Sequence, residues 1–305
     1  HFFYNFKQQP YFQCITLAPL RCMFYTEKRF VLGVIPLASA RGSLTKDGIR
    51  IYESSDFSGM AEAGRVAATI LDDIVPHIKV GVGTGEIDLI ITDMVNAHGA
   101  KSATIGYRGY KHASCISVNH VVCHGVPGDK RIKDGDILNI DVTVIVDGWF
   151  GDTSRMYAVG KLPRKSERLI QVTHDALFKG IEAVKPGNFF GDIGYAIQSF
   201  VEGHRMSVVR DFCGHGLGQV FHAPPNVLHY GDVGTGPVLE EGMFFTIEPM
   251  VNLGRPETKV LDDDWTAVTR DRTLSAQFEH SVGVTATGVE IFTLSPAGRF
   301  HPTYN

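Results

Sequence analysis

The stretch NIDVTVIVDGWFGDTSR, residues 139–155, joins a strong hairpin signal to two acidic side chains. The dipeptide Asp147-Gly148 at its centre is favoured in two-residue hairpin turns. Runs rich in β-branched and aromatic residues flank this dipeptide over residues 138–146 and 149–156. The stretch therefore predicts an antiparallel hairpin in the middle of the chain.

The register of this hairpin places both acidic residues on one face. If the turn holds, Val146 faces Trp149, and counting back along the strands places Thr143 opposite Asp152. Asp141 lies two residues from Thr143, so the strand period of two makes the carboxylates diagonal neighbours. Two buried carboxylates on one face require a neutralising cation. The alternative interpretation is an exposed face on which both acids are solvated, because the apolar residues alternate onto the opposite face.

Three more potential metal ligands follow in glycine-rich or strand-like contexts. His215 stands between glycines in DFCGHGLG, Glu248 closes the apolar run of FTIEPM, and Glu279 interrupts QFEHSV. The complete set is Asp141, Asp152, His215, Glu248 and Glu279. Four carboxylates and one imidazole suit two divalent cations that share bridging oxygens, and they do not suit a closed structural zinc site. The sequence predicts a two-metal hydrolase.

The ordered motifs SCISVNHVVCHGVP, DGDILNIDVTVIVDGWFGDTSRMY, GHGLGQVFHAPPNV, GMFFTIEPMV and LSAQFEHSVGVT resemble those of the type I methionine aminopeptidases. The resemblance covers roughly residues 45–294, and none of the family's five metal ligands is substituted in this chain. It implies that Asp152 and Glu279 bridge two metals, that Asp141 chelates one, and that His215 and Glu248 complete the other. The metal could be manganese, cobalt, iron or zinc, because ligand chemistry alone does not choose among them.

The resemblance also implies a catalytic group and a substrate pocket. Glu248 is expected to act as general base, and His124 and His222 to hold the peptide and donate hydrogen bonds to the oxyanion. The expected slot for the methionine side chain is lined by Tyr107, Tyr110, Cys115, His124, Phe221, His222 and Trp265. The other ten histidines are expected to be structural or solvated.

The implied function is removal of the initiator methionine from nascent polypeptides when the second residue is small, by attack of metal-activated water. The ribosome is a further expected contact. An aminopeptidase P or prolidase is the rival from the same fold, and the Trp265 and double-tyrosine pocket argues against it. A non-catalytic binding protein of this fold is the second rival, and the intact ligand set argues against it.

The resemblance implies an α/β (α+β) pita-bread fold, with two pseudo-symmetric halves around a central antiparallel sheet. An internal repeat agrees with this expectation, because residues 79–98 align with residues 185–204 after a shift of 106 positions. Each copy leads from a glycine turn into an apolar-periodic helix. Two further helices are expected over residues 56–75 and 166–184.

Composition favours a single metallopeptidase catalytic domain over residues 45–305. The chain has 305 residues, 44% of them hydrophobic, and a formal net charge of -4, which provides no general basic surface for nucleic acid. No apolar run approaches the roughly 20 residues of a membrane span. Five cysteines without CxxC spacing indicate neither a zinc finger nor a disulfide framework, and they favour a reducing, cytoplasmic setting. Without a zinc module, the chain resembles the bacterial or organellar form of the family, and a monomer is expected.

Residues 1–44 lie outside this pattern and form an N-terminal extension rich in aromatic residues. Over residues 1–30, four basic side chains stand against a single acid. Three interpretations compete: a disordered or vector-derived leader, a contact with the ribosome or another partner, and a targeting presequence of transit type. The third would make the location organellar. The run FVLGVIPLASA also imitates a secretory signal, although its apolar core is short and contains a proline.

Overall fold

The computed structural model describes residues 40–302 and 304. All but the last five residues of the expected N-terminal extension therefore lie outside the described residues. Those five belong to the ordered fold, since β1 (Ser43–Leu44) pairs with β2 (Arg50–Ile51). Arg41 also forms an ion pair with buried Asp56 at 2.9 Å.

The predicted hairpin forms the centre of the molecule. Strands β6 (Ile137–Val146) and β7 (Trp149–Ala158) are antiparallel, and Val146 faces Trp149 and Thr143 faces Asp152, as predicted. Asp147 and Gly148 have φ angles of 48° and 84°, the left-handed pair that a type I′ turn requires. The turn thus fixes the register that brings the acidic residues to one face.

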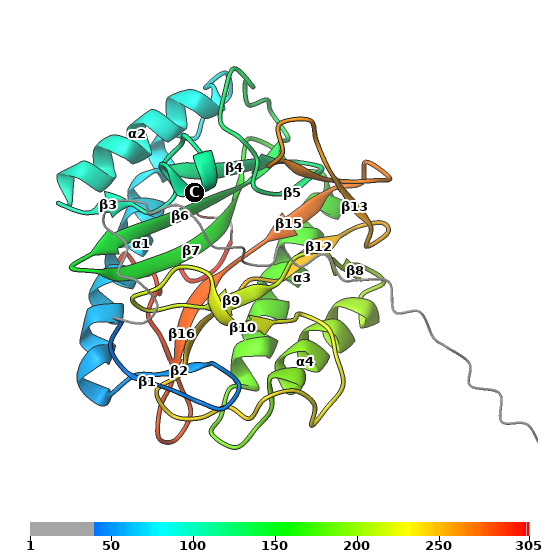
Figure 1. The fold of residues 1–305 in the computed structure, drawn as a ribbon. Helices are drawn as coiled ribbons and strands as arrows, with labels where there is room; N and C mark the ends of the chain where they lie inside the picture. Colours follow the sequence, from blue (N-terminus) through cyan, green and yellow to red (C-terminus); the bar gives the residue numbers. More distant parts are fainter. Residues whose placement is uncertain (1–39, 303, 305) are drawn as a thin grey trace, which may run out of the picture.

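The first half of the fold is built on β6. Strand β4 (Ser114–Val118) and the short β3 (Lys101–Ser102) pair with β6 on the side away from β7. Helices α1 (Phe57–Asp73) and α2 (Thr84–Ala97) belong to this half (Figure 1). Helix α1 packs so closely on β7 that a Cβ atom at Gly151 would overlap the backbone oxygen of Ala63.

The second half contains helices α3 (Arg164–Glu182) and α4 (Phe190–Gly203) with two small sheets. One sheet has the order β10 (Ala223–Val227), β9 (Gly214–Gly216), β11 (Phe244–Ile247), β16 (His280–Val284) and β17 (Val289–Ile291). The other sheet has the order β15 (Ser275–Gln277), β12 (Met250–Asn252) and β8 (Ser207–Val208). A third small sheet carries β13 (Thr258–Val260), β14 (Ala267–Thr269) and β5 (Val121–Cys123).

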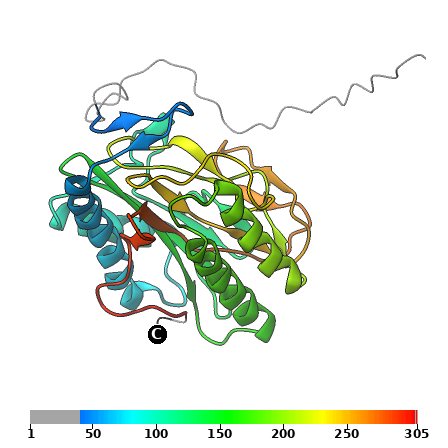
Figure 2. The same cartoon turned by 90° about the horizontal axis from the view of Figure 1, so that it is seen from below.

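The two halves show the predicted relation. Helices α2 and α4 begin and end at positions that differ by the same 106 residues, and α1 and α3 precede them in their respective halves. All the strand pairs of the described residues are antiparallel, and a bridge between Ser154 and Glu279 connects β7 to the second half. Figure 2 shows the helices of the first half (blue to cyan) on one side of the picture and those of the second half (green) on the other.

The helix bounds differ slightly from the prediction, for reasons visible in the sequence. Helix α1 ends at Asp73, because the ring of Pro76 is incompatible with a continued helix, and a short 3₁₀ turn over Val75–His77 follows. Helix α3 starts at Arg164, directly after Pro163, two residues earlier than expected. No helix within the described ranges is long and apolar enough to cross a membrane.

The contact between α1 and β7 should be sensitive to a single methyl group. Gly151→Ala is expected to lower the free energy of unfolding by about 1–3 kcal/mol, because the added carbon overlaps the backbone of α1. Urea denaturation would measure the loss. Gly203→Ala is the matched control, since a Cβ atom there meets nothing within 4 Å. Equal stability of both variants would contradict the close packing.

Candidate metal centre

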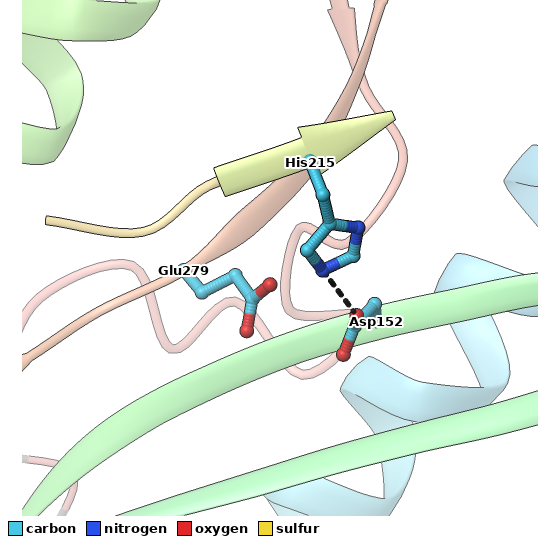
Figure 3. Close-up of side chains that lie close together, drawn as sticks. All are labelled: Asp152, His215 and Glu279. Atoms are coloured by element: carbon cyan, nitrogen blue, oxygen red, sulfur yellow. Dashed lines mark ion pairs between the residues drawn. The ribbon is translucent and has the colours of Figure 1, made fainter. Parts of the chain in front are cut away.

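The five predicted ligands come from strands of both halves. Asp141 lies on β6, Asp152 on β7 and His215 on β9, while Glu248 directly follows β11 and Glu279 directly precedes β16. The side chains of Asp152, His215 and Glu279 converge (Figure 3), and their ligand atoms all lie within 4.8 Å of one another. The distance from His215 Nε2 to Asp152 Oδ2 is 3.5 Å. The structure thus brings three of the predicted ligands into one cluster.

Glu248 and Asp141 adjoin this cluster. The Glu248 carboxylate approaches the imidazole, with 3.7 Å between Glu248 Oε1 and His215 Nε2. Asp141 faces Ser154 across the hairpin, and its pKa responds to the charge of Asp152. Asp141 is not among the three side chains that meet within 4.8 Å. Contacts within 4.8 Å link the other four predicted ligands, whereas Asp141 is linked to them by charge.

Glycines on either side of His215 let β9 fit between its neighbours. A Cβ atom at Gly214 would overlap the backbone oxygen of Thr246 on β11, and one at Gly216 would overlap that of Pro224 on β10. Only glycine permits this approach on both sides. The imidazole between them is therefore the side chain that β9 contributes to the cluster.

Hydroxyl and amide groups hold the carboxylates in place. Thr143 Oγ1 donates to Asp152 Oδ1 at 2.7 Å, and Thr246 Oγ1 donates to Glu248 Oε1 at 2.8 Å. Gln277 Nε2 donates to Glu248 Oε2 at 3.3 Å. The hairpin register predicts Thr143 opposite Asp152, whereas the other two groups were not predicted. Their spacing could have identified them, because each lies two residues from a predicted acidic ligand and so shares its strand face.

The raised pKa values of the clustered carboxyl groups indicate that a bound cation would stabilise their ionised forms. Burial raises the pKa of Asp152 to about 7, and the Thr143 hydrogen bond opposes the shift. Burial, followed by repulsion from Asp152, also raises the pKa of the carboxyl groups of Asp141, Glu248 and Glu279. Burial lowers the pKa of His215 to about 4, so the imidazole is neutral and can bind a metal. An oxygen-rich set with one nitrogen therefore fits divalent metal ions.

The two predicted catalytic histidines share an unusual backbone. His124 and His222 both have a φ of 55°, in the left-handed region that non-glycine residues seldom adopt. His222 lies beside the cluster, with 4.3 Å between its ring centroid and that of His215. Burial lowers the pKa of His124 to about 4. Strained backbone of this kind is concentrated at functional sites.

The predicted pocket residues form two aromatic groups. In the first, the rings of Tyr110 and Trp265 lie 4.8 Å apart, and His124 approaches Trp265 at 6.4 Å. In the second, the rings of Tyr107 and Phe221 lie 5.0 Å apart, and a 2.7 Å hydrogen bond joins the Tyr107 hydroxyl to His222 Nδ1. Cys115 is buried on β4, opposite Asp141. The role of these residues in binding methionine stays a prediction.

A buried acid that the sequence analysis did not single out supports the first aromatic group. Asp88 of α2 accepts hydrogen bonds from the backbone N–H groups of Ala113 and Ser114, at 3.0 and 2.9 Å, and from the Ser114 hydroxyl. The Tyr110 hydroxyl in turn donates to the Ser114 carbonyl at 2.9 Å. Asp88 therefore fixes the start of β4, the strand that carries Cys115.

The raised pKa of Asp152 predicts a pH-dependent stability. Folding raises this pKa from 3.8 to about 7, so the folded protein holds a proton that the unfolded chain has lost. The unfolding free energy of the metal-free protein should therefore fall as the pH rises from about 4 to about 7. Buried histidines also contribute to the pH dependence of stability. The comparison is therefore made with Asp152→Asn, which retains those histidines. Between pH 5 and pH 8 the wild type should lose about 2–3 kcal/mol relative to this variant, measured by urea denaturation with chelator. A pH-independent difference would contradict the raised pKa.

Residues 58–286 match the metallopeptidase family M24. A methionine aminopeptidase of Rickettsia prowazekii is 55% identical over 257 residues, which are 84% of this chain and 99% of that protein. A methionine aminopeptidase of Escherichia coli strain K12 is 53% identical over 248 residues, covering 81% and 94% of the two chains. The similarity thus spans almost the full length of both relatives.

Solved structures agree with the sequence comparison. The crystal structure of the Rickettsia prowazekii methionine aminopeptidase gives a TM-score of 0.80, covering 81% of this chain and 100% of that one. The Thermotoga maritima methionine aminopeptidase gives 0.79 at 39% identity, covering 80% and 99%. The prolidase of Pyrococcus horikoshii shares the fold alone, at 20% identity and a TM-score of 0.63. The pita-bread fold is thereby confirmed, and the chain belongs to the metallopeptidase family M24, among its methionine aminopeptidases.

Proposed function

We propose that this enzyme removes the N-terminal methionine from nascent polypeptides whose second residue is small. One observation carries the proposal: Asp152, His215 and Glu279, from both halves of the fold, converge in a buried cluster that fits divalent metal ions. The family membership supplies the reaction class, which is hydrolysis of the peptide bond after a terminal methionine. Preference for a small second residue is part of the proposal.

The proposed cofactor is a pair of divalent ions, with manganese, cobalt, iron and zinc as candidates. Asp152 and Glu279 would bridge them, Asp141 would chelate one, and His215 and Glu248 would complete the other. When bound, such ions lower the pKa of coordinated water, polarise the scissile carbonyl and anchor the substrate amine. The support is the excess of buried carboxylates, whose pKa values burial and mutual repulsion raise.

The protein's own groups would move the protons and stabilise the developing charge. Glu248 is proposed as the general base, because its carboxylate lies at the cluster and burial raises its pKa above the usual value of a carboxyl group. His124 and His222 are proposed to hold the peptide and to donate hydrogen bonds to the carbonyl oxygen as it gains negative charge. The 2.7 Å hydrogen bond with Tyr107 orients the His222 ring for this task.

The two aromatic groups described above would enclose the methionine side chain. A flexible thioether packs well against aromatic rings and a cysteine sulfur. We assign this slot to Tyr107, Tyr110, Cys115, His124, Phe221, His222 and Trp265. Prolidase or aminopeptidase P activity remains the rival, and the solved prolidase supports only a shared fold, at 20% identity.

The cellular setting completes the proposal. Residues 45–305 would act as one catalytic domain and as a monomer, on nascent chains at the ribosome. The proposed location is the cytoplasm, in line with the bacterial relatives and with five cysteines that show no CxxC spacing. An organellar location is the alternative if residues 1–44 act as a transit peptide.

Peptide cleavage tests the function directly. Protein stripped of metal by a chelator should release methionine from a Met-Ala-Ser peptide only after manganese or cobalt is added. An Ala-Pro-Ser peptide serves as control and should stay intact. Cleavage of the proline peptide alone would instead identify an aminopeptidase P, and silence on both peptides under each metal would favour a binding protein.

Substitutions separate metal binding from catalysis. Asp152→Ala or Glu279→Ala should abolish activity, because each removes a proposed bridging ligand. His124→Ala should lower kcat by about 100-fold, the usual cost of losing one oxyanion donor, while manganese still binds in a calorimetric titration. Normal turnover in either bridging variant would exclude the dinuclear mechanism.

A further inference from the structure

A buried histidine outside the predicted site contacts the proposed general base. His229 follows β10 and has no solvent exposure. Its Nε2 accepts a hydrogen bond of 3.1 Å from the backbone N–H of Glu248. His229 was among the histidines expected to be structural or solvated. No local sequence pattern singles it out, because 19 residues separate it from Glu248.

The backbone of Glu248 needs this partner because the strand breaks there. Strand β11 ends at Ile247, Pro249 follows Glu248, and β12 begins at Met250 in a different sheet. The ladder between β11 and β16 pairs Phe244 through Ile247, so it ends one residue before Glu248. A buried N–H group without an acceptor would destabilise this junction. His229 provides the acceptor.

The cost of burying His229 argues against a purely structural role. Because Nε2 accepts a hydrogen bond, a neutral ring carries its proton on Nδ1. Nδ1 is buried and has no hydrogen-bond partner among the described residues. An apolar side chain would remove this unpaired donor, but it would leave the Glu248 N–H unpaired. The arrangement thus leaves one ring N–H unpaired and satisfies the backbone N–H of Glu248.

We propose that His229 is a positioning residue that holds the Glu248 carboxylate at the metal cluster through its backbone; the inference rests on the proposed role of Glu248. Thr246 and Gln277 fix the two carboxylate oxygens, at 2.8 and 3.3 Å, while His229 fixes the N–H of the same residue. Together the three contacts hold both ends of Glu248. Partners of this kind typically contribute 10- to 100-fold to metal affinity or activity.

The test compares variants that lack or retain an acceptor. His229→Leu should lower kcat for the Met-Ala-Ser peptide with manganese by about 10- to 100-fold, with little change in KM. His229→Gln should restore kcat to within a few-fold, because its amide oxygen can take the place of Nε2. If the leucine variant fails to fold, His229→Phe provides the comparison. Urea denaturation checks that every assayed variant is folded.

Two controls distinguish the possible failures. His174 is also buried and lies on α3, so His174→Leu should lower stability and leave kcat unchanged. Glu248→Gln should be inactive. Wild-type kcat in His229→Leu with an inactive Glu248→Gln would overturn the positioning role alone, as would an equal loss of kcat in His174→Leu. Full activity in Glu248→Gln would overturn the proposed function of Glu248 itself.

Discussion

The need to neutralise four clustered carboxylates, two of them buried and two partly buried, governs the rest of the structure. Asp152 and Glu279 are each only 3% exposed, and repulsion from Asp152 adds to the effect of burial on Glu279. A fold accepts such a cluster only where a cation or protons compensate it. The carboxylate oxygens are positioned by the turn at Asp147 and by the hydroxyl groups of Thr143 and Thr246. The glycines beside His215 position the imidazole.

Local sequence signals were sufficient for the hairpin but not for the surroundings of Glu248. The Asp147-Gly148 turn fixes a register by itself, so the pairing of Thr143 with Asp152 could be predicted by counting residues. The contact between His229 and Glu248 depends on the path of a loop between two strands. Local propensity does not specify such a path, and this type of contact was therefore missed.

The helices show the same division between local and long-range information. The 106-residue repeat predicted two equivalent helices, and α2 and α4 have equivalent bounds. Proline chemistry accounts for the small errors at the ends of α1 and α3. The family resemblance, and not periodicity, supplied the roles of the histidines and the pocket. Those roles depend on chemistry that no hydrophobic pattern encodes.

The division of the proposed ligands between the halves would make a bound metal a linker as well as a cofactor. Asp141 and Asp152 belong to the first half, whereas His215, Glu248 and Glu279 belong to the second. Neither half holds the full set, so metal affinity reports on how well the halves are docked. The segment between β7 and α3, residues 159–163, is the single covalent crossing between them. A cut there would leave two fragments held together by the hydrophobic core that they share and, when it is bound, by the metal.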